Sequence, residues 1–162
     1  MSRAIAAIVF LISLSLAVHP DVRAQRRGRA RGMAGVPLGP QLGPRAGYDF
    51  DAETWSLGGQ MRLGGGRGLE LIPSGDFFFD TDAWQLNLDA AFPLGRLRAF
   101  YGGLGAGFYH QTVTETHLNL FLGLRLGGRV STPVRPYAEA RWMRVDGDDP
   151  FRLVFGFNLA VR

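Results

Sequence analysis

FRLVFGFNLAVR, residues 151–162, places a bulky apolar side chain at every second position. The positions between them are mostly small or polar, namely Arg152, Val154, Gly156, Asn158, Ala160 and Arg162. A period of two indicates a β-strand with one apolar face. That face must be covered by other strands or by lipid, so the stretch predicts a larger sheet around it.

The same alternation recurs in earlier segments, which are separated by the Gly, Asp or Pro clusters that are typical of hairpins. We expect these strands at residues 45–50, 54–64, 68–79, 83–94, 97–110, 117–127 and 134–145. Together with residues 151–162 they make about eight strands with short connections. This pattern predicts an all-β, eight-stranded antiparallel up-and-down barrel in which the last strand pairs with the first.

Two places fit regular strands less well. Pro73 lies inside a predicted strand and cannot donate to the ladder, so we expect a bulge or kink over residues 73–75. Residues 97–110 are rich in glycine, which predicts a sharp bend in the closed barrel. The glycines concerned are Gly102, Gly103, Gly105 and Gly107.

Residues 1–24 have the pattern of a secretory signal peptide. Arg3 precedes an apolar run over residues 4–18, and small residues follow at the positions of a cleavage site, which predicts cleavage after Ala24. The alternative, a retained membrane helix, needs about 20 apolar residues, and this run is shorter. We therefore expect the mature protein to leave the cytoplasm.

Residues 25–44 are rich in Arg, Gly and Pro and predict a basic, disordered linker before a barrel over residues 45–162. The run RRGRAR at residues 26–31 reads either as a solvated tail or as a contact for an acidic partner, and the first interpretation is favoured. Because part of the net charge of +4 lies in this linker, the charge does not indicate nucleic-acid binding. The chain contains no Cys, so disulfides are excluded.

Alternation alone does not say whether the apolar face points inward, as in a soluble ligand-carrying barrel, or outward into lipid. Three observations favour lipid. Strands of about 10 residues match the length that crosses a bilayer. Aromatic residues gather where the strands would meet one interface, as a predicted girdle of Tyr48, Phe50, Trp55, Phe77, Phe79, Trp84, Phe108, Trp142 and Phe151.

The third observation is the charge of the connections, which alternates along the chain. One predicted end holds the acidic residues Asp51, Glu53, Asp80, Asp82, Glu115, Asp146, Asp148 and Asp149. The other end holds Arg67, Arg96, Arg129 and Arg135. The barrel is therefore expected to have two chemically different mouths.

With these features, residues 45–162 resemble the small eight-stranded outer-membrane barrels of Gram-negative bacteria, of the OmpX and OmpA transmembrane-domain type. In the last strand, Gly156, Leu159 and Val161 are similar to the signal that the barrel-assembly machinery reads in that class. The resemblance implies an outer-membrane location and a periplasmic N-terminus. It also implies contacts with outer-membrane lipid and lipopolysaccharide, and we expect a monomer that binds no nucleic acid.

If the apolar face points outward, polar side chains fill the lumen. The predicted luminal network contains Asp49, Arg62, Glu70, Asp76, Asp89, Arg125, Glu139, Arg141 and Arg152, accompanied by Gln85, Asn87, Asn119 and Asn158. A barrel of about eight strands is only just wide enough for side chains to fill, so these groups should pair and close the bore. A narrow ion path is the less favoured interpretation.

One pair in this network is predicted in detail. If GGGR at residues 64–67 forms a tight turn, the strands around it fold back so that Arg62 lies directly opposite Glu70. Both side chains would then point into the lumen. We expect them to touch.

An enzyme acting on lipid A at the outer rim is a further alternative, because related scaffolds use a His and a Ser for that chemistry. His110 and His117 are the candidates, but the position two residues after His117 is Asn119, so the nucleophile is missing. Ser56 and Ser74 lie on other strands. The sequence has no metal-ligand or cofactor motif, and DGDD at residues 146–149 is more typical of a turn than of a calcium site.

The sequence thus favours an integral outer-membrane barrel with a structural or surface-interaction role and without enzymatic activity or cofactors. The alternative from another class is a secreted, soluble, lipocalin-like barrel that carries an apolar ligand. The two differ in which face of the strands is polar.

Overall fold

The computed structural model describes residues 39–64, 68–95, 99–126, 134–144 and 149–161. The predicted signal peptide and most of the predicted linker lie outside these residues. The same is true of Asp146, Asp148, Arg67, Arg96 and Arg129 among the charged connections, and of most of the turn at residues 64–67. Within the described part, no helix is long and apolar enough to cross a membrane.

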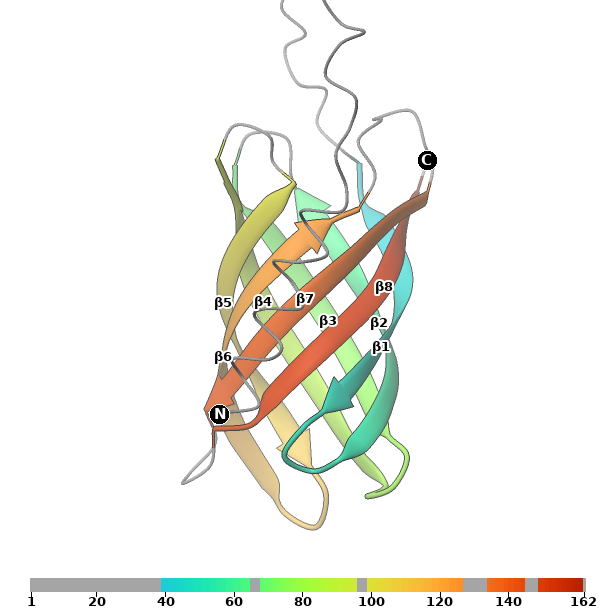
Figure 1. The fold of residues 1–162 in the computed structure, drawn as a ribbon, viewed down its shortest axis with the longest axis vertical. Coiled ribbons are helices and arrows are strands. Elements are labelled where there is room, and N and C mark those ends of the chain that lie inside the picture. Colours follow the sequence, from blue (N-terminus) through green and yellow to red (C-terminus); the bar gives the residue numbers. More distant parts are fainter. Residues whose placement is uncertain (1–38, 65–67, 96–98, 127–133, 145–148, 162) are drawn as a thin grey trace, which may run out of the picture. The chain divides into compact units, whose positions relative to one another are not determined.

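The described residues form one closed antiparallel barrel in which each strand pairs with its neighbours in the chain and β1 pairs with β8 (Figure 1). The strands are β1 Gln41–Asp49, β2 Thr54–Gly64, β3 Glu70–Phe78, β4 Ala83–Leu94, β5 Phe100–His110, β6 Thr114–Arg125, β7 Val134–Arg144 and β8 Phe151–Ala160. The predicted fold class is confirmed.

The first strand starts earlier than expected. β1 begins at Gln41, so residues 41–44, which were predicted to lie in the linker, belong to the barrel. Gly43 and Pro44 carry the linker-like composition, yet both pair with β2. Neither residue pairs with β8, so no hydrogen bond to β8 is lost because Pro44 has no amide hydrogen.

Pro73 does not produce the expected bulge. β3 keeps one register against β2 on both sides of it, from Ser56↔Phe78 to Gly64↔Glu70. The ladder between these strands simply lacks the pairs of Met61 and Arg62. The sheet therefore tolerates a proline by omitting bonds, with no change of register.

Alternation places apolar residues on the outer face of the barrel and polar residues on the inner face. Leu104, Leu118 and Leu120 are each more than 60% exposed, whereas Asp89 and Glu139 are fully buried. Where the inner side chains are large, the facing residue is often glycine. A Cβ on Gly123 would lie 2.2 Å from Cζ of Tyr101, so this glycine leaves the space that the ring occupies.

The glycines of β5 serve the same purpose, and the prediction of a sharp bend there has no support in the pairing. β5 is in unbroken register with β4 and with β6 along its whole length. A Cβ on Gly103 would meet the ring of Phe121, and a Cβ on Gly105 would meet the carboxylate of Asp89. The glycine-rich strand thus makes room for the side chains of its neighbours.

Candidate functional site

The candidate site is the inner wall of the barrel. The structure buries eight of the nine charged residues of the predicted luminal network to 6% exposure or less, namely Asp49, Arg62, Glu70, Asp76, Asp89, Glu139, Arg141 and Arg152. The ninth, Arg125, is half-buried with a side chain that is 24% exposed. Gln85, Asn87, Asn119 and Asn158 also point inward and are buried.

Asp76 on β3 organises one cluster in the lumen. Arg45 donates to it with two nitrogens, from Nε to Oδ1 at 2.8 Å and from Nη2 to Oδ2 at 2.5 Å. Arg152 Nη2 lies 3.4 Å from the same Oδ2 and donates to Ser56 Oγ at 2.8 Å. A second nitrogen of Arg152 donates to Gln85. This arrangement gives the carboxylate a forked partner and a second cation, all out of water.

Glu139 on β7 organises a second cluster. Its Oε1 accepts hydrogen bonds from Arg62 Nη2 at 2.9 Å and from the Tyr101 hydroxyl at 2.7 Å. Its Oε2 accepts from Arg141 Nε at 2.9 Å. Arg141 Nη2 in turn lies 2.8 Å from Oδ2 of Asp89. One carboxylate therefore accepts hydrogen bonds from two arginines, Arg62 on β2 and Arg141 on its own strand, and each arginine has a second carboxylate partner.

Glu70 forms the third cluster, and it contains the pair that the sequence predicts. Arg62 Nη1 lies 2.9 Å from Glu70 Oε2, so the expected contact is present. The expected register is wrong, because Glu70 pairs with Gly64 and the arginine reaches it diagonally along the wall. Arg125 Nη2 binds the other oxygen of Glu70 at 2.6 Å.

We expect a double-mutant cycle to detect this pair. Arg62→Ala and Glu70→Ala should each lower the free energy of unfolding in detergent micelles, because each leaves a buried charge without one partner. The double mutant should lose less than the sum of the two, by about 0.5–3 kcal/mol. Denaturant titration followed by tryptophan fluorescence measures the three variants.

A second cycle serves as the control. Arg152 and Glu70 have no common partner in the contacts above, so their losses should add to within about 0.5 kcal/mol. Strict additivity for Arg62 and Glu70 would show that their contact contributes nothing to stability.

The arginines and carboxylates of the luminal network are equal in number. The network contains five arginines (Arg45, Arg62, Arg125, Arg141 and Arg152) and five carboxylates (Asp49, Glu70, Asp76, Asp89 and Glu139), of which Asp49 also lines the hairpin mouth. Between the clusters, an apolar layer of Ile72, Ala91, Tyr101 and Phe121 packs inside the bore. Paired charges and packed rings make this interior a filled core rather than an open channel.

The mouth at the β1–β2, β3–β4 and β5–β6 hairpins holds a cavity of about 440 Å³. Its lining includes the carboxylates of Asp49, Asp51, Glu115 and Asp149. The imidazole of His117 on β6 lines it farther inside. Neither Glu139 nor Asp76 lines it. The cavity is an acidic vestibule above the clusters, and it favours cations at this mouth.

Sequence reasoning did not select several inner residues that complete these clusters. Arg45, Tyr101 and Tyr137 are at most 2% exposed and lie among the luminal charges. The alternation of residues 45–50 could have identified Arg45 as an inward residue, because Ala46 and Tyr48 lie on the other face of the same strand. Tyr101 was missed because the neighbouring glycines have no side chains to indicate which positions of this strand face inward.

The predicted girdle residues gather at the hairpin mouth, and several of their rings touch. Tyr48 contacts Phe50 and Trp55 at centroid distances of 5.0 and 5.1 Å. Phe151 contacts Phe50 at 5.6 Å and Trp142 at 5.1 Å, which extends this row across β7, β8, β1 and β2. Phe77 and Phe79 contact each other, Trp84 stacks on His110, and Phe108 is exposed on β5.

The three residues of the predicted assembly signal lie on both faces of β8 and its end. Gly156 faces inward, where a Cβ would come within 2.6 Å of the Tyr137 hydroxyl, while Leu159 and Val161 are exposed apolar residues. Recognition by an assembly machinery stays a prediction.

The candidate catalytic residues do not come together. His117 is buried in the lumen, where its Nε2 lies 2.8 Å from Asn87 Oδ1 and from Gln85 Nε2. Ser56 is engaged with Arg152. His110 contacts the Thr114 hydroxyl at 2.8 Å on the outer surface. In the described residues no serine lies within hydrogen-bond distance of either histidine, so the geometry offers no His–Ser pair.

The comparisons with known proteins concern the fold. No protein-family model and no curated protein matches this sequence. The N-terminal β-barrel domain of Pseudomonas aeruginosa OprF is similar in structure, with a TM-score of 0.59 and 14% identity over 76% of this chain and 98% of that one. A de novo designed transmembrane β-barrel has a TM-score of 0.55 and 16% identity over 80% of this chain and 100% of the designed one.

A second designed barrel, TMB2.3, has a TM-score of 0.53 and 13% identity over 81% of this chain. The chain therefore has the fold of an eight-stranded, closed, antiparallel transmembrane β-barrel. The likeness to OprF agrees with the OmpA type among the expected relatives. The OmpX type stays an expectation.

Proposed function

We propose that the protein is an integral outer-membrane β-barrel with a side-chain-filled lumen and a structural or surface-interaction role. The observation that carries this proposal is the polarity of the wall. Large apolar side chains are exposed on every strand, while ion pairs fill the inside. In water this arrangement would leave a contiguous apolar surface far larger than soluble monomers tolerate.

The same polarity opposes the soluble alternative. A soluble barrel that carries an apolar ligand needs an apolar interior and a polar exterior. Here the interior holds Arg45, Asp76 and Glu139 in contact with other charges, and the outer face holds leucines and aromatic rings. Lipid provides the one common environment in which this outer face is favourable.

The remaining expectations form part of the proposal. The resemblance to the OmpA type supports a periplasmic N-terminus, which places the acidic hairpin mouth and its aromatic girdle at the outer leaflet. Outer-membrane lipid and lipopolysaccharide would be the lasting partners, and the barrel-assembly machinery a transient one. The balanced, packed lumen supports a plug rather than an ion path, and the scattered histidines and serines support a protein without enzymatic activity.

Fractionation of a Gram-negative host that produces the full chain tests the location. The mature chain should sediment with the outer membrane and should migrate on a gel at different positions before and after heating. Because the chain contains no cysteine, single-cysteine variants report orientation. Asp80→Cys should react with an impermeant maleimide on intact cells, and Gly68→Cys only after permeabilisation.

Gly68 suits this purpose, because a Cβ there would meet no atom within 4 Å. Recovery of the chain in the periplasmic extract would overturn the membrane proposal. Labelling of both variants from outside would overturn the orientation alone.

A further inference from the structure

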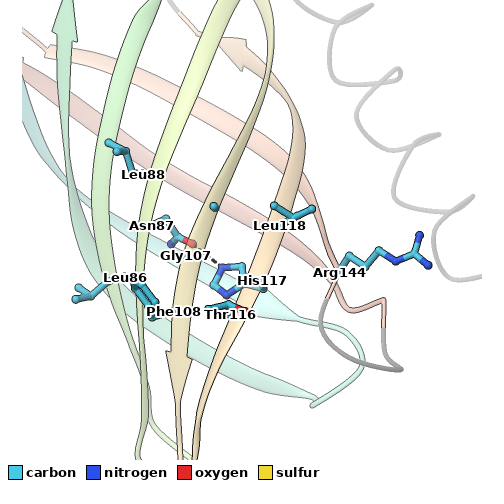
Figure 2. Close-up of a pocket in the computed structure, with 10 residues that line it drawn as sticks. Leu86, Asn87, Leu88, Gly107, Phe108, Thr116, His117, Leu118 and Arg144 are labelled. Atoms are coloured by element: carbon cyan, nitrogen blue, oxygen red, sulfur yellow. Dashed lines mark hydrogen bonds between the residues drawn. The ribbon is translucent and has the colours of Figure 1, made fainter.

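The outer face of the strands carries one charged side chain. All residues of the eight strands are described, and alternation turns their other charged residues inward, but Arg144 at the end of β7 points away from the wall (Figure 2). It is exposed. On the outer face of a membrane barrel a charged side chain is costly in the hydrocarbon and is tolerated near the interface, where it can meet lipid head groups.

Arg144 ends a row of residues that runs across four strands. Leu88 on β4 pairs with Ala106 on β5, Ala106 pairs with Leu118 on β6, and Leu118 pairs with Arg144 on β7. Leu88 and Leu118 are 58% and 64% exposed. Because Ala106 lies between them and has a short side chain, the outer surface has a low point at Ala106, with a leucine on each side.

This low point is part of an open groove of about 790 Å³, which Leu86, Phe108 and Arg144 also line. Figure 2 shows Leu86, Leu88 and Leu118 on the wall, with the guanidinium of Arg144 at one side. Gly107 lies beneath the groove, where a Cβ would crowd the Leu86 carbonyl oxygen and the inner side chains of Asn87 and His117. Asn87, Thr116 and His117 also line the groove, but Leu86, Leu88, Phe108 and Leu118 are exposed and apolar, and such a surface suits an acyl chain.

The cation lies at the depth of lipid head groups. Trp142 is the preceding outward residue of β7 and belongs to the aromatic girdle at the hairpin mouth. Aromatic girdles mark the interface between hydrocarbon and head groups, and Arg144 is one outward position nearer the mouth. Its guanidinium matches a phosphate in shape and charge and can bind it with two hydrogen bonds.

We propose that this groove and Arg144 bind one lipid A moiety of lipopolysaccharide, with an acyl chain over Ala106 and a phosphate on the guanidinium. The choice of lipid A rests on the proposed function, whose orientation places this mouth in the outer leaflet. The vestibule carboxylates Asp51, Glu115 and Asp149 disfavour a phosphate elsewhere at this mouth. The site should therefore hold one lipid.

Native mass spectrometry of the full mature chain, folded in detergent micelles, tests the site. The probes are hexa-acylated lipid A with both phosphates, the same lipid A without phosphates, and phosphatidylglycerol. One phosphorylated lipid A should be retained per barrel. Arg144→Gln should weaken its retention by about tenfold or more, because the substitution removes charge-assisted hydrogen bonds. Arg135→Gln, on the inner face of the same strand, is the matched control and should leave the retention of lipid A unchanged.

A second pair of variants tests the groove. Ala106→Leu fills the low point with an apolar side chain and should reduce the retention of lipid A severalfold, while Ala90→Leu on the outer face of β4, outside the groove, should not. Heat-dependent migration on a gel shows whether each variant is folded.

Equal retention of dephosphorylated lipid A or of phosphatidylglycerol would overturn the assignment to a phosphorylated glycolipid. Unchanged binding by both Arg144→Gln and Ala106→Leu would overturn the site. A chain that fractionates with the outer membrane but retains no lipid A would overturn this inference and leave the proposed function standing.

Discussion

Glu139→Gln should lower the free energy of unfolding by about 3–5 kcal/mol, the largest loss expected from a single neutral replacement in this barrel. The amide keeps the shape of the side chain but removes its charge. Arg62 Nη2 and Arg141 Nε, each 2.9 Å away, would then face an uncharged group in the buried interior. The Tyr101 hydroxyl, which donates to the same carboxylate, would lose its charged acceptor.

Glu115→Gln is the matched control. It makes the same chemical change at the exposed hairpin mouth, where the expected change in stability is within about 0.5 kcal/mol. Denaturant titrations of both variants in the same micelles give the two free energies. If Glu139→Gln unfolds at the same denaturant concentration as the parent chain, water reaches the cluster and screens its charges, and the lumen is not the packed core described above.

Gly43→Ala should prevent the barrel from closing. A Cβ at this position would lie 1.7 Å from the carbonyl oxygen of Phe157 and 2.7 Å from its carbon. Both atoms belong to the backbone of β8, which cannot rotate away as a side chain could. The seam between β1 and β8 would have to open, and a barrel without that seam has two unpaired edges in lipid. We expect the heat-modifiable folded form to be absent.

Gly59→Ala provides the comparison for this prediction. Gly59 lies on β2 and pairs with Pro44, but a Cβ there would meet nothing closer than the Gly43 carbonyl oxygen at 3.7 Å. This variant should fold like the parent chain. Since the clash at Gly43 involves the first side-chain atom, Gly43→Val should behave like Gly43→Ala. A folded, heat-modifiable Gly43→Ala barrel would mean that β1 and β8 lie farther apart than the structure places them.

The sequence predicted the elements of this fold well, because alternation is a property of each strand alone. Residues 54–64 and 83–94 were expected as strands with the observed bounds. The start of β1 was missed because the glycine and proline at positions 43 and 44 have the composition of a linker. Pairing with β2 overrides that local preference.

The inner clusters were predicted as a set of residues and not as a set of contacts. Alternation selects the inward side chains, but which of them meet depends on the stagger of the strands around the barrel. The contact between Arg62 and Glu70 was expected from a direct cross-strand pair and is made diagonally. The contact between Arg62 and Glu139 joins β2 to β7, and no local pattern encodes it.

The side-chain bonds between β2 and β8, which flank β1 in the closed barrel, also determine when the barrel can acquire its stability during assembly. Gln60 Nε2 donates to Asn158 at 2.9 Å, and these residues are 98 positions apart in the chain. Arg152 Nη2 donates to Ser56 Oγ at 2.8 Å, and these residues are 96 positions apart. Contacts between such distant residues form late in folding. A sheet that entered lipid before β8 reached β1 would expose Arg152 without Ser56 and Asp76, and Arg62 without Glu139. Insertion and closure should therefore occur as one cooperative step.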